Sequence, residues 1–206
     1  MKKDRILDVA EILFAEKGYE GTSVRDIAQQ ADVNIAMISY YFGSKEKLLS
    51  ALIAARAENS TLQLEELGRN SSMDSWTKLD TMVEFYVDRF FNKHHFHNIM
   101  SRQIIQEKEL QDQINEIKVK NLEILRRIIM EGIDRKVFRQ VDVELTVLTM
   151  IGAISQATMS RLLFSYIFHL DPQMEDRAYF QHIAPRVKKH LKSLLRAHLD
   201  IKTQVQ

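Results

Sequence analysis

The sequence predicts an all-α protein, with an N-terminal three-helix helix-turn-helix domain followed by a C-terminal helical domain. Apolar residues recur at three- and four-residue spacing along most of the 206-residue chain. Only two prolines and six glycines interrupt it, and helix-capping residues stand where the apolar pattern restarts. With 45% hydrophobic residues, a chain of this length can bury a sizeable core. We place the domain boundary after residue 47, which gives domains over 1–47 and 48–206.

The first predicted helix covers about residues 5–14 and ends before Gly18, because glycine readily adopts the left-handed conformation of a helix C-cap. The second begins after Ser23, which forms an S-x-x-D capping box with Asp26. Asn34 is a good N-cap for a short third helix over about residues 35–41. These three helices can share one small core.

The third helix leaves an unusual set of side chains pointing outward. Val33, Ile38 and Phe42 can be buried together, whereas the opposite side carries apolar, hydroxyl and aromatic groups. A short helix held against a preceding small-residue helix is the helix-turn-helix arrangement, whose second helix enters the major groove of DNA. The pattern therefore predicts double-stranded DNA as a partner.

Three linked segments resemble the DNA-binding domain of the TetR family of transcriptional regulators. They are F-A-E-K-G-Y, T-S-V-R-D-I-A and Y-Y-F-G-S-K-E-K-L-L, and the resemblance spans about residues 4–52. It implies phosphate contacts near Thr22, Ser23, Arg25, Tyr40, Tyr41 and Lys45. It implies base contacts from the recognition helix, for which we name Asn34, Ile35, Ala36, Met37 and Ser39. The family usually has Tyr where this chain has Ser39, a departure that concerns base preference and not DNA binding.

The charge of the predicted DNA-binding domain does not by itself indicate a nucleic-acid binder. Residues 1–47 hold seven Lys or Arg and eight Asp or Glu, and the whole chain has a net charge of +1. Position matters more, since six cations lie in the N-terminal arm or near helix starts, where phosphate contacts are made. These six are Lys2, Lys3, Arg5, Arg25, Lys45 and Lys47.

Beyond Ser44, which caps a longer helix, the pattern predicts further helices through Phe90 and from Leu110 to Ile129. A short segment over about 96–106 lies between them. We expect Gly132 and the stretch from Val137 to Gln140 to end the second of these helices, and Asp142 to cap another. That next helix, about 143–168, is apolar nearly all round, which predicts burial on both faces.

Small residues on this apolar helix suggest a homodimer, because they let a helix of a second chain approach closely. A symmetric DNA site normally needs two helix-turn-helix domains, called reading heads below, one from each chain of a dimer. The candidate dimer residues are Gly152, Ser155, Met159, Leu191, Leu194 and Leu195. The alternative is that both stripes only complete the core of one protomer.

The middle helices carry large apolar and aromatic residues with a few polar groups among them, the usual composition of a ligand site. Their candidate pocket residues are Trp76, Phe85, Tyr86, Arg89, Phe90, Met100, Gln103, Gln156 and Met159. Each of them can equally be ordinary core or surface. The resemblance implies a regulator, here predicted to be a repressor that an unknown small apolar or amphipathic effector releases from DNA.

Other classes of protein find less support in the sequence. The chain has no Cys, Gly-rich phosphate loop or G-x-S-x-G motif, so we predict no enzyme and no cofactor. His94, His95 and His97 cannot share one helix face, and we predict no metal site. No apolar run reaches the length of a membrane span, and we expect a cytoplasmic protein without a membrane partner. An architectural or division-linked DNA binder, controlled by a protein partner instead of a ligand, is the alternative function.

Overall fold

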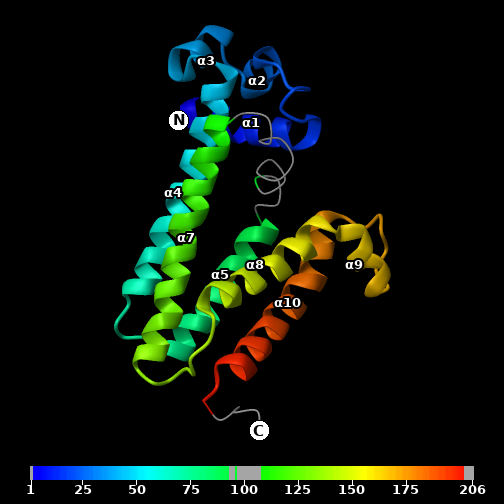
Figure 1. The fold of residues 1–206 in the computed structure, drawn as a ribbon. Coiled ribbons are helices and arrows are strands. Elements are labelled where there is room, and N and C mark those ends of the chain that lie inside the picture. The colour runs from blue at the N-terminus through cyan, green and yellow to red at the C-terminus, as the bar shows by residue number, and fades with distance from the viewer. Residues whose placement is uncertain (1, 93–95, 97–107, 202–206) are drawn as a thin grey trace. The chain divides into compact units, whose positions relative to one another are not determined.

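The computed structural model describes residues 2–92, 96 and 108–201, and every extended element among them is a helix (Figure 1). The N-terminal helices are α1 (Lys2–Lys17), α2 (Val24–Ala31), α3 (Ile35–Phe42) and α4 (Lys45–Arg69). They are followed by α5 (Ser75–Asn92), α7 (Lys108–Asp134), α8 (Val143–Met159), α9 (Arg161–Ile167) and α10 (Asp176–Leu199). The predicted all-α class is confirmed.

The chain forms two compact units. The first comprises Met1–Leu62 and His95–Lys120, and the second comprises Gln63–His94 and Asn121–Gln206. Helices α4 and α7 each contribute one part to each unit. The predicted boundary after residue 47 lies near the start of α4, inside the first unit, and remains a prediction about where an independent domain ends.

The core of the first unit is built by α1, α2, α3 and the N-terminal half of α4. Ile6, Phe14, Ile27, Ile38 and Leu52 are almost completely buried in it. The caps form as predicted: Ser23 and Asp26 make a reciprocal capping box, Asn34 caps α3, and Gly18 has a φ of 82°. These local signals determine where the first three helices begin or end. The apolar faces of the helices can therefore pack together in one core.

The first part of α7 joins this same unit, although it lies far along the chain. Leu110 and Ile114 are buried in the core that α1–α4 form. Ser50 on α4 donates a 2.8 Å hydrogen bond to the Gln113 side chain, which in turn donates to the Ser50 carbonyl at 3.1 Å. The first part of α7 thus belongs to the core of the first unit, which the sequence did not indicate.

The second unit packs α5 against α10 and α8 (Figure 1). Its largest apolar cluster includes Val83 and Tyr86 of α5, Ile154 of α8 and Tyr179 of α10. Ion pairs border the contact between α5 and α10, for example Lys192 with Glu84 at 2.5 Å. Asp142 accepts a backbone N–H bond and caps α8, as predicted, and Asp74 caps α5 in the same way.

The helix predicted over about 143–168 is wrong as a single element. It divides at Ser160 into α8 and α9, whose axes are bent by 88°. Contacts from α10 occupy the break: Tyr179 donates a 2.7 Å hydrogen bond to the Ala157 carbonyl, and Arg161 bonds Asp176. No proline or glycine marks the bend, because the breaking groups come from a distant helix.

Within one protomer only one face of α8 is buried, so burial of its second face remains a prediction about a dimer. Val147 and Ile154 are buried, whereas Leu145 and Leu148 on the other face are 61% and 50% exposed. Helix α7 ends at Asp134, between Gly132 and the 137–140 stretch that were together predicted to end it. A Cβ at Gly132 would lie 2.1 Å from the Phe138 ring, so the glycine provides room for that ring.

None of the described helices is by itself long and apolar enough to cross a membrane; only α8 and α9 taken together, across their bend, have that length and composition.

Candidate DNA-reading surface and effector region

Helix α3 is anchored through two side chains and exposes most of the others. Ile38 is 1% exposed and Phe42 is 7% exposed, and both pack into the core of the first unit. Gly43 ends the helix with a φ of 83°, in the left-handed region that glycine tolerates. This short, well-capped helix is therefore held rigidly with one face outward.

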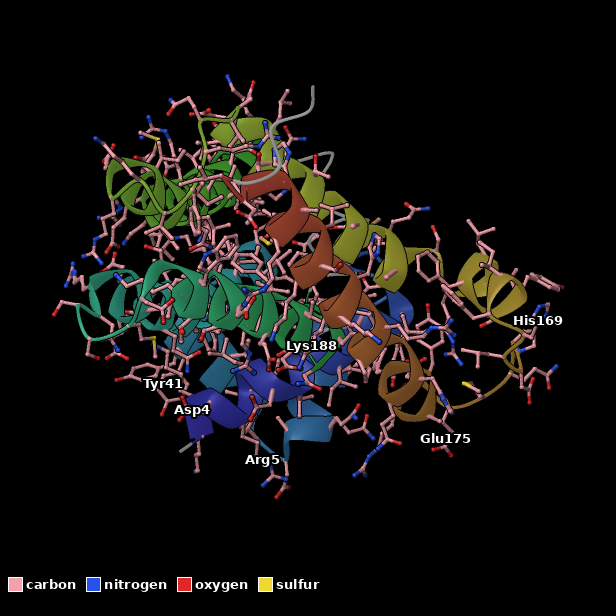
Figure 2. The ribbon with its side chains drawn as sticks, turned by 90° about the horizontal axis from the view of Figure 1, so that it is seen from below. Asp4, Arg5, Tyr41, His169, Glu175 and Lys188 are labelled. Atoms are coloured by element: carbon pink, nitrogen blue, oxygen red, sulfur yellow. The ribbon has the colours of Figure 1, made fainter. Side chains whose placement is uncertain are left out.

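The outward face of α3 carries no charged side chain. Tyr40 is 84% exposed, Ile35 43% and Tyr41 38%, and the Tyr40 and Tyr41 rings meet edge to face at 5.3 Å. Asn34, Ala36 and Ser39 are exposed as well, and Met37 is half-buried. Figure 2 shows Tyr41 at the outer surface, together with Arg5 from α1. Methyl, hydroxyl and aromatic groups are thus displayed together, in keeping with the sequence pattern.

Asn34 already has a partner within the protein. Its side-chain oxygen accepts a 2.8 Å hydrogen bond from the Ala36 N–H and so caps the start of α3. Only its NH2 group is then free of that bond for a contact with DNA. Asn34 thus combines a structural role with a place at the edge of the predicted reading surface.

Two of the predicted DNA contacts point inward. Thr22 is 1% exposed, and its hydroxyl lies 2.7 Å from the Gly18 carbonyl and 3.0 Å from the Leu13 carbonyl. Lys45 places its ammonium 2.9 Å from the Tyr19 carbonyl and 3.3 Å from the Thr22 carbonyl. Through these bonds Thr22 ties the loop between α1 and α2 to the end of α1, and Lys45 ties the same loop to the start of α4. The sequence motif did not indicate this structural role.

Ser23 and Arg25 are exposed at the start of α2, next to the capping box. Hydrogen bonds from the Ser23 hydroxyl and backbone N–H lower the pKa of Asp26 below its ordinary value. Ser44 hydrogen-bonds Glu46 at the start of α4 and likewise lowers the pKa of that carboxyl group. Because these carboxylates already accept bonds from the helix starts, their repulsion of nearby phosphate is partly offset.

A further ion-paired group in this unit was missed from the sequence. Arg56 of α4 bonds Glu11 at 2.7 Å and also bonds Asp8, both on α1. Asp8 and Glu11 lie one helical turn apart, and this spacing is the one sequence feature that could have indicated a shared cation. Nothing near them in the sequence identifies Arg56, which lies 45 residues after Glu11, as that cation. The contact holds α4 against α1.

The predicted pocket residues do not gather at one place. Phe85 and Phe90 are half-buried against the core of the second unit, and Tyr86 is 5% exposed within it. Trp76 packs on Phe138 with a ring separation of 4.6 Å, beneath the guanidinium of Arg196.

The remaining pocket candidates divide into three groups. Gln156 and Met159 are exposed on α8 and therefore lie away from the interior. Met100 and Gln103 lie outside the described residues, as do the three clustered histidines. Arg89, half-buried on α5, has a guanidinium nitrogen, Nη1, that is shielded from solvent.

The candidate dimer residues differ in burial: some lie in the core of the protomer and others at its surface. Leu191 and Leu195 are each 1% exposed and belong to the core of the protomer, so they cannot form a surface seam. Leu194 is 38% exposed and Met159 55%. Gly152 is open to solvent, with no atom within 4 Å of the point that a Cβ would occupy, and Ser155 is half-buried beside it.

The described residues of the second unit form surface hollows, and two of them lie on α10. One of about 550 Å³ lies between α5 and α10 and is lined by Phe91, Phe180 and Lys188, the last of which Figure 2 labels. The other, of about 430 Å³, lies beside Leu145, Leu194 and His198. Both open widely to the surface, and Lys188 in the first is already paired with Asp88.

Family models cover most of the chain. Residues 6–52 match the model described as "Bacterial regulatory proteins, tetR family", and residues 76–183 match "Tetracyclin repressor-like, C-terminal domain". The second model alone spans more than half of the chain. It includes α5, α8 and α9, so the family relationship extends well beyond the reading head.

Curated relatives match over less than half of the chain. The probable HTH-type transcriptional regulator YttP of Bacillus subtilis is 47% identical over 73 residues, 35% of either chain. IcaR of Staphylococcus aureus, a negative regulator of the biofilm operon icaADBC, is 33% identical over 88 residues, 42% of this chain and 46% of IcaR. The matched part is therefore less than half the length of either relative.

Solved structures match over nearly the whole length. FadR of Bacillus subtilis, crystallised with stearoyl-CoA, has a TM-score of 0.72 and 26% identity over 92% of this chain and 97% of FadR. PfmR of Thermus thermophilus, a TetR family regulator, has a TM-score of 0.68 and 25% identity over 90% of this chain and 98% of PfmR. The chain belongs to the TetR family of helix-turn-helix, DNA-binding transcriptional regulators and is not an enzyme.

Proposed function

We propose that this regulator is a repressor that binds a palindromic operator as a homodimer and leaves it when a small amphipathic molecule binds its C-terminal part. The single observation that carries the DNA half is the uncharged outer face of α3, where Ile35, Ser39 and Tyr40 are exposed together on a short, well-capped helix. Such a face suits the edges of bases better than it suits water.

Within this proposal, DNA contacts divide by the chemistry that each side chain exposes. Ser39 and Ala36 offer a hydroxyl and a methyl group to base edges, the methyl being suited to a thymine methyl. Arg25 and Ser23 lie at a helix start, where phosphates bind. Thr22 and Lys45 act instead by positioning the loop before α2, since their polar groups are used within the protein.

The dimer surface is proposed on the exposed face of α8. Leu145, Leu148 and Met159 are each at least half exposed there, with the open Gly152 between them, and Leu194 of α10 adds to the patch. Contiguous exposed apolar groups mark interaction surfaces in soluble proteins. A second copy supplies the paired reading heads that a palindrome requires.

The effector half of the proposal is supported by FadR, whose crystal structure holds stearoyl-CoA and whose chain is 26% identical to this one. The second unit has an interior rich in aromatic and aliphatic groups, to which Phe85, Tyr86 and Phe90 contribute. An effector releases DNA only by preferring the conformation that binds it poorly, and a coupling of about 1–3 kcal/mol is the usual scale.

Selection of bound sequences from random duplex DNA tests the repressor proposal. We expect a palindrome whose half-sites lie about one helical turn, or a multiple of it, apart. Stearoyl-CoA added to the resulting complex should release the protein, whereas coenzyme A alone should not. A nonpalindromic or sequence-independent outcome would overturn the dimeric repressor, and a complex that no acylated or apolar small molecule dissociates would overturn ligand control.

A further inference from the structure

Arg89 of α5 is a half-buried cation that makes no hydrogen bond or ion pair with another described residue. Its Nη1 is shielded from solvent and has no hydrogen-bond partner within that part of the chain. Burial lowers the pKa of the Arg89 guanidinium, and the opposing electrostatic effect comes from Tyr86, not from a carboxylate. A guanidinium that loses its water without gaining an acceptor costs free energy, so its presence in the second unit calls for a reason.

The other cations that the described residues bury or half-bury are all paired. Lys78, 2% exposed, bonds Glu131 at 2.7 Å and the Gly68 carbonyl at 3.2 Å. The rest of the group each have a carboxylate or a carbonyl oxygen in contact: Lys45, Arg56, Arg126, Arg139, Arg161, Lys188 and Lys192. Arg89 therefore differs from every one of them.

An aromatic cluster begins beside Arg89, at Tyr86. Tyr86 lies three residues earlier on the same helix face and interacts electrostatically with it. Phe85 and Phe90 pack around Tyr86, with ring separations of 5.8 Å and 6.3 Å. A half-buried cation beside an aromatic cluster, in the unit proposed to hold the effector, matches an amphipathic molecule with one anionic end.

We propose that Arg89 binds the anionic group of the effector, a carboxylate or phosphate attached to a long apolar chain. This inference rests on the proposed ligand control and specifies the class of ligand. Both a free fatty acid and a fatty acyl-CoA supply such an anion. In either case the charge-assisted bond forms only when the ligand is present, so Arg89 is held unpaired until then.

The first test is the stability of the ligand-free protein. Arg89→Met keeps most of the side-chain volume and removes the uncompensated charge, so the thermal midpoint should rise by about 2–4 °C. Arg127→Met, at an exposed arginine on α7, is the matched control and should leave the midpoint nearly unchanged. A lower midpoint for Arg89→Met would show that the guanidinium stabilises the protomer, and would overturn the inference.

The second test compares four probes on the full-length protein: stearate, stearoyl-CoA, octadecanol and coenzyme A. With Arg89→Gln, affinity for the probe that binds through its anion should fall about 10- to 100-fold. Affinity for octadecanol, which has the chain but no charge, should change little. Loss with stearate identifies a carboxylate, and loss with stearoyl-CoA alone identifies the acyl-CoA head group.

Failure of this inference is distinguishable from failure of the proposed function. If stearoyl-CoA or stearate releases the operator equally from wild-type and Arg89→Gln protein, ligand control stands and Arg89 is not the anion-binding residue. If none of the four probes binds the wild type or releases its operator, the inference and the proposed ligand control are both overturned.

Discussion

Lys45 lies over the ring of Tyr19, with its Nζ 4.0 Å from the ring centroid and 2.9 Å from the Tyr19 carbonyl oxygen. The side chain at the start of α4 thereby binds the loop that precedes α2, and it also contacts the Thr22 carbonyl. A cation–π contact and two hydrogen bonds to carbonyl oxygens use most of what a lysine ammonium can offer. Lys45 is therefore held by contacts within the protein, whereas its neighbour Lys47 is exposed.

We expect Lys45→Met to destabilise the protein by about 1–2 kcal/mol, because it removes the cation–π contact and both carbonyl bonds. The exposed Lys47→Met is the matched control and should have little effect. Urea denaturation measures both. Operator affinity at several salt concentrations gives a second readout: a positioning lysine leaves the log K against log salt slope unchanged, whereas two lost phosphate contacts in a dimer flatten it by about 2.

Ser39→Ala and Ala36→Gly should lower affinity for the operator while leaving affinity for scrambled DNA nearly the same. Both residues are exposed on α3 and carry no charge, so the salt dependence should not change. Each loss should be about 1–3 kcal/mol per half-site if the group reads a base directly. Binding isotherms on the two duplexes give the result, and an equal loss on both would assign these positions to backbone contacts.

Acid should weaken the start of α2 through Asp26. The pKa of this carboxyl group is lowered in the folded protein from an ordinary value of 3.8, so its contribution to stability is present above that value. It disappears as the pH falls through the lower, folded-state value. Thermal midpoints of wild type and Asp26→Asn should therefore differ at pH 6 and converge below about pH 4. A difference that stays constant to pH 3 and below would contradict the capping role of the ionised form.

Gly152→Leu should convert a dimer into monomers without unfolding the protomer. Within the protomer nothing lies within 4 Å of a Cβ at this position, so any crowding must come from a second chain. Overpacking a close helix contact costs about 1–3 kcal/mol. Sedimentation velocity gives the assembly state, and Lys189→Leu, on the exposed side of α10, serves as the control. A variant that sediments as a stable dimer would place the seam elsewhere.

The buried pair of Lys78 and Glu131 should be strongly coupled. Lys78→Met removes a 2.7 Å ion pair and the bond to the Gly68 carbonyl at the end of α4, and we expect a loss of about 2–3 kcal/mol. Glu131 retains Arg135 at 2.8 Å, which limits the loss. A double-mutant cycle with Glu131→Gln should give a coupling of about 1–2 kcal/mol. Additive single losses would mean that the two side chains act independently.

The sequence by itself predicted the first three helices and their caps, because the signals for them are local. The Ser23–Asp26 capping box, the Asn34 cap and the left-handed Gly18 each depend on residues within a few positions of one another. The apolar spacing of Ile27 and Ile38 then determines which faces are buried. Element order, helix type and the exposed face of α3 all follow from such short-range rules.

Only the tertiary structure decided which side of each long helix is covered. The apolar character of α8 is almost the same all round, so its periodicity cannot tell the buried Ile154 from the exposed Leu148. The same holds for Leu191 and Leu194 on α10, three residues apart, of which the first enters the core. Their environments depend on neighbours that arrive from distant parts of the chain.

The roles of individual polar groups were likewise decided in three dimensions. Lys45 meets a carbonyl 26 residues away, Arg56 reaches α1, and the bend between α8 and α9 depends on Tyr179 and Arg161. Arg89, by contrast, is distinguished by the absence of an acceptor within the described residues. Local sequence determines helices and their caps because those interactions span one turn, whereas pairing and burial depend on packing between helices that are remote in sequence.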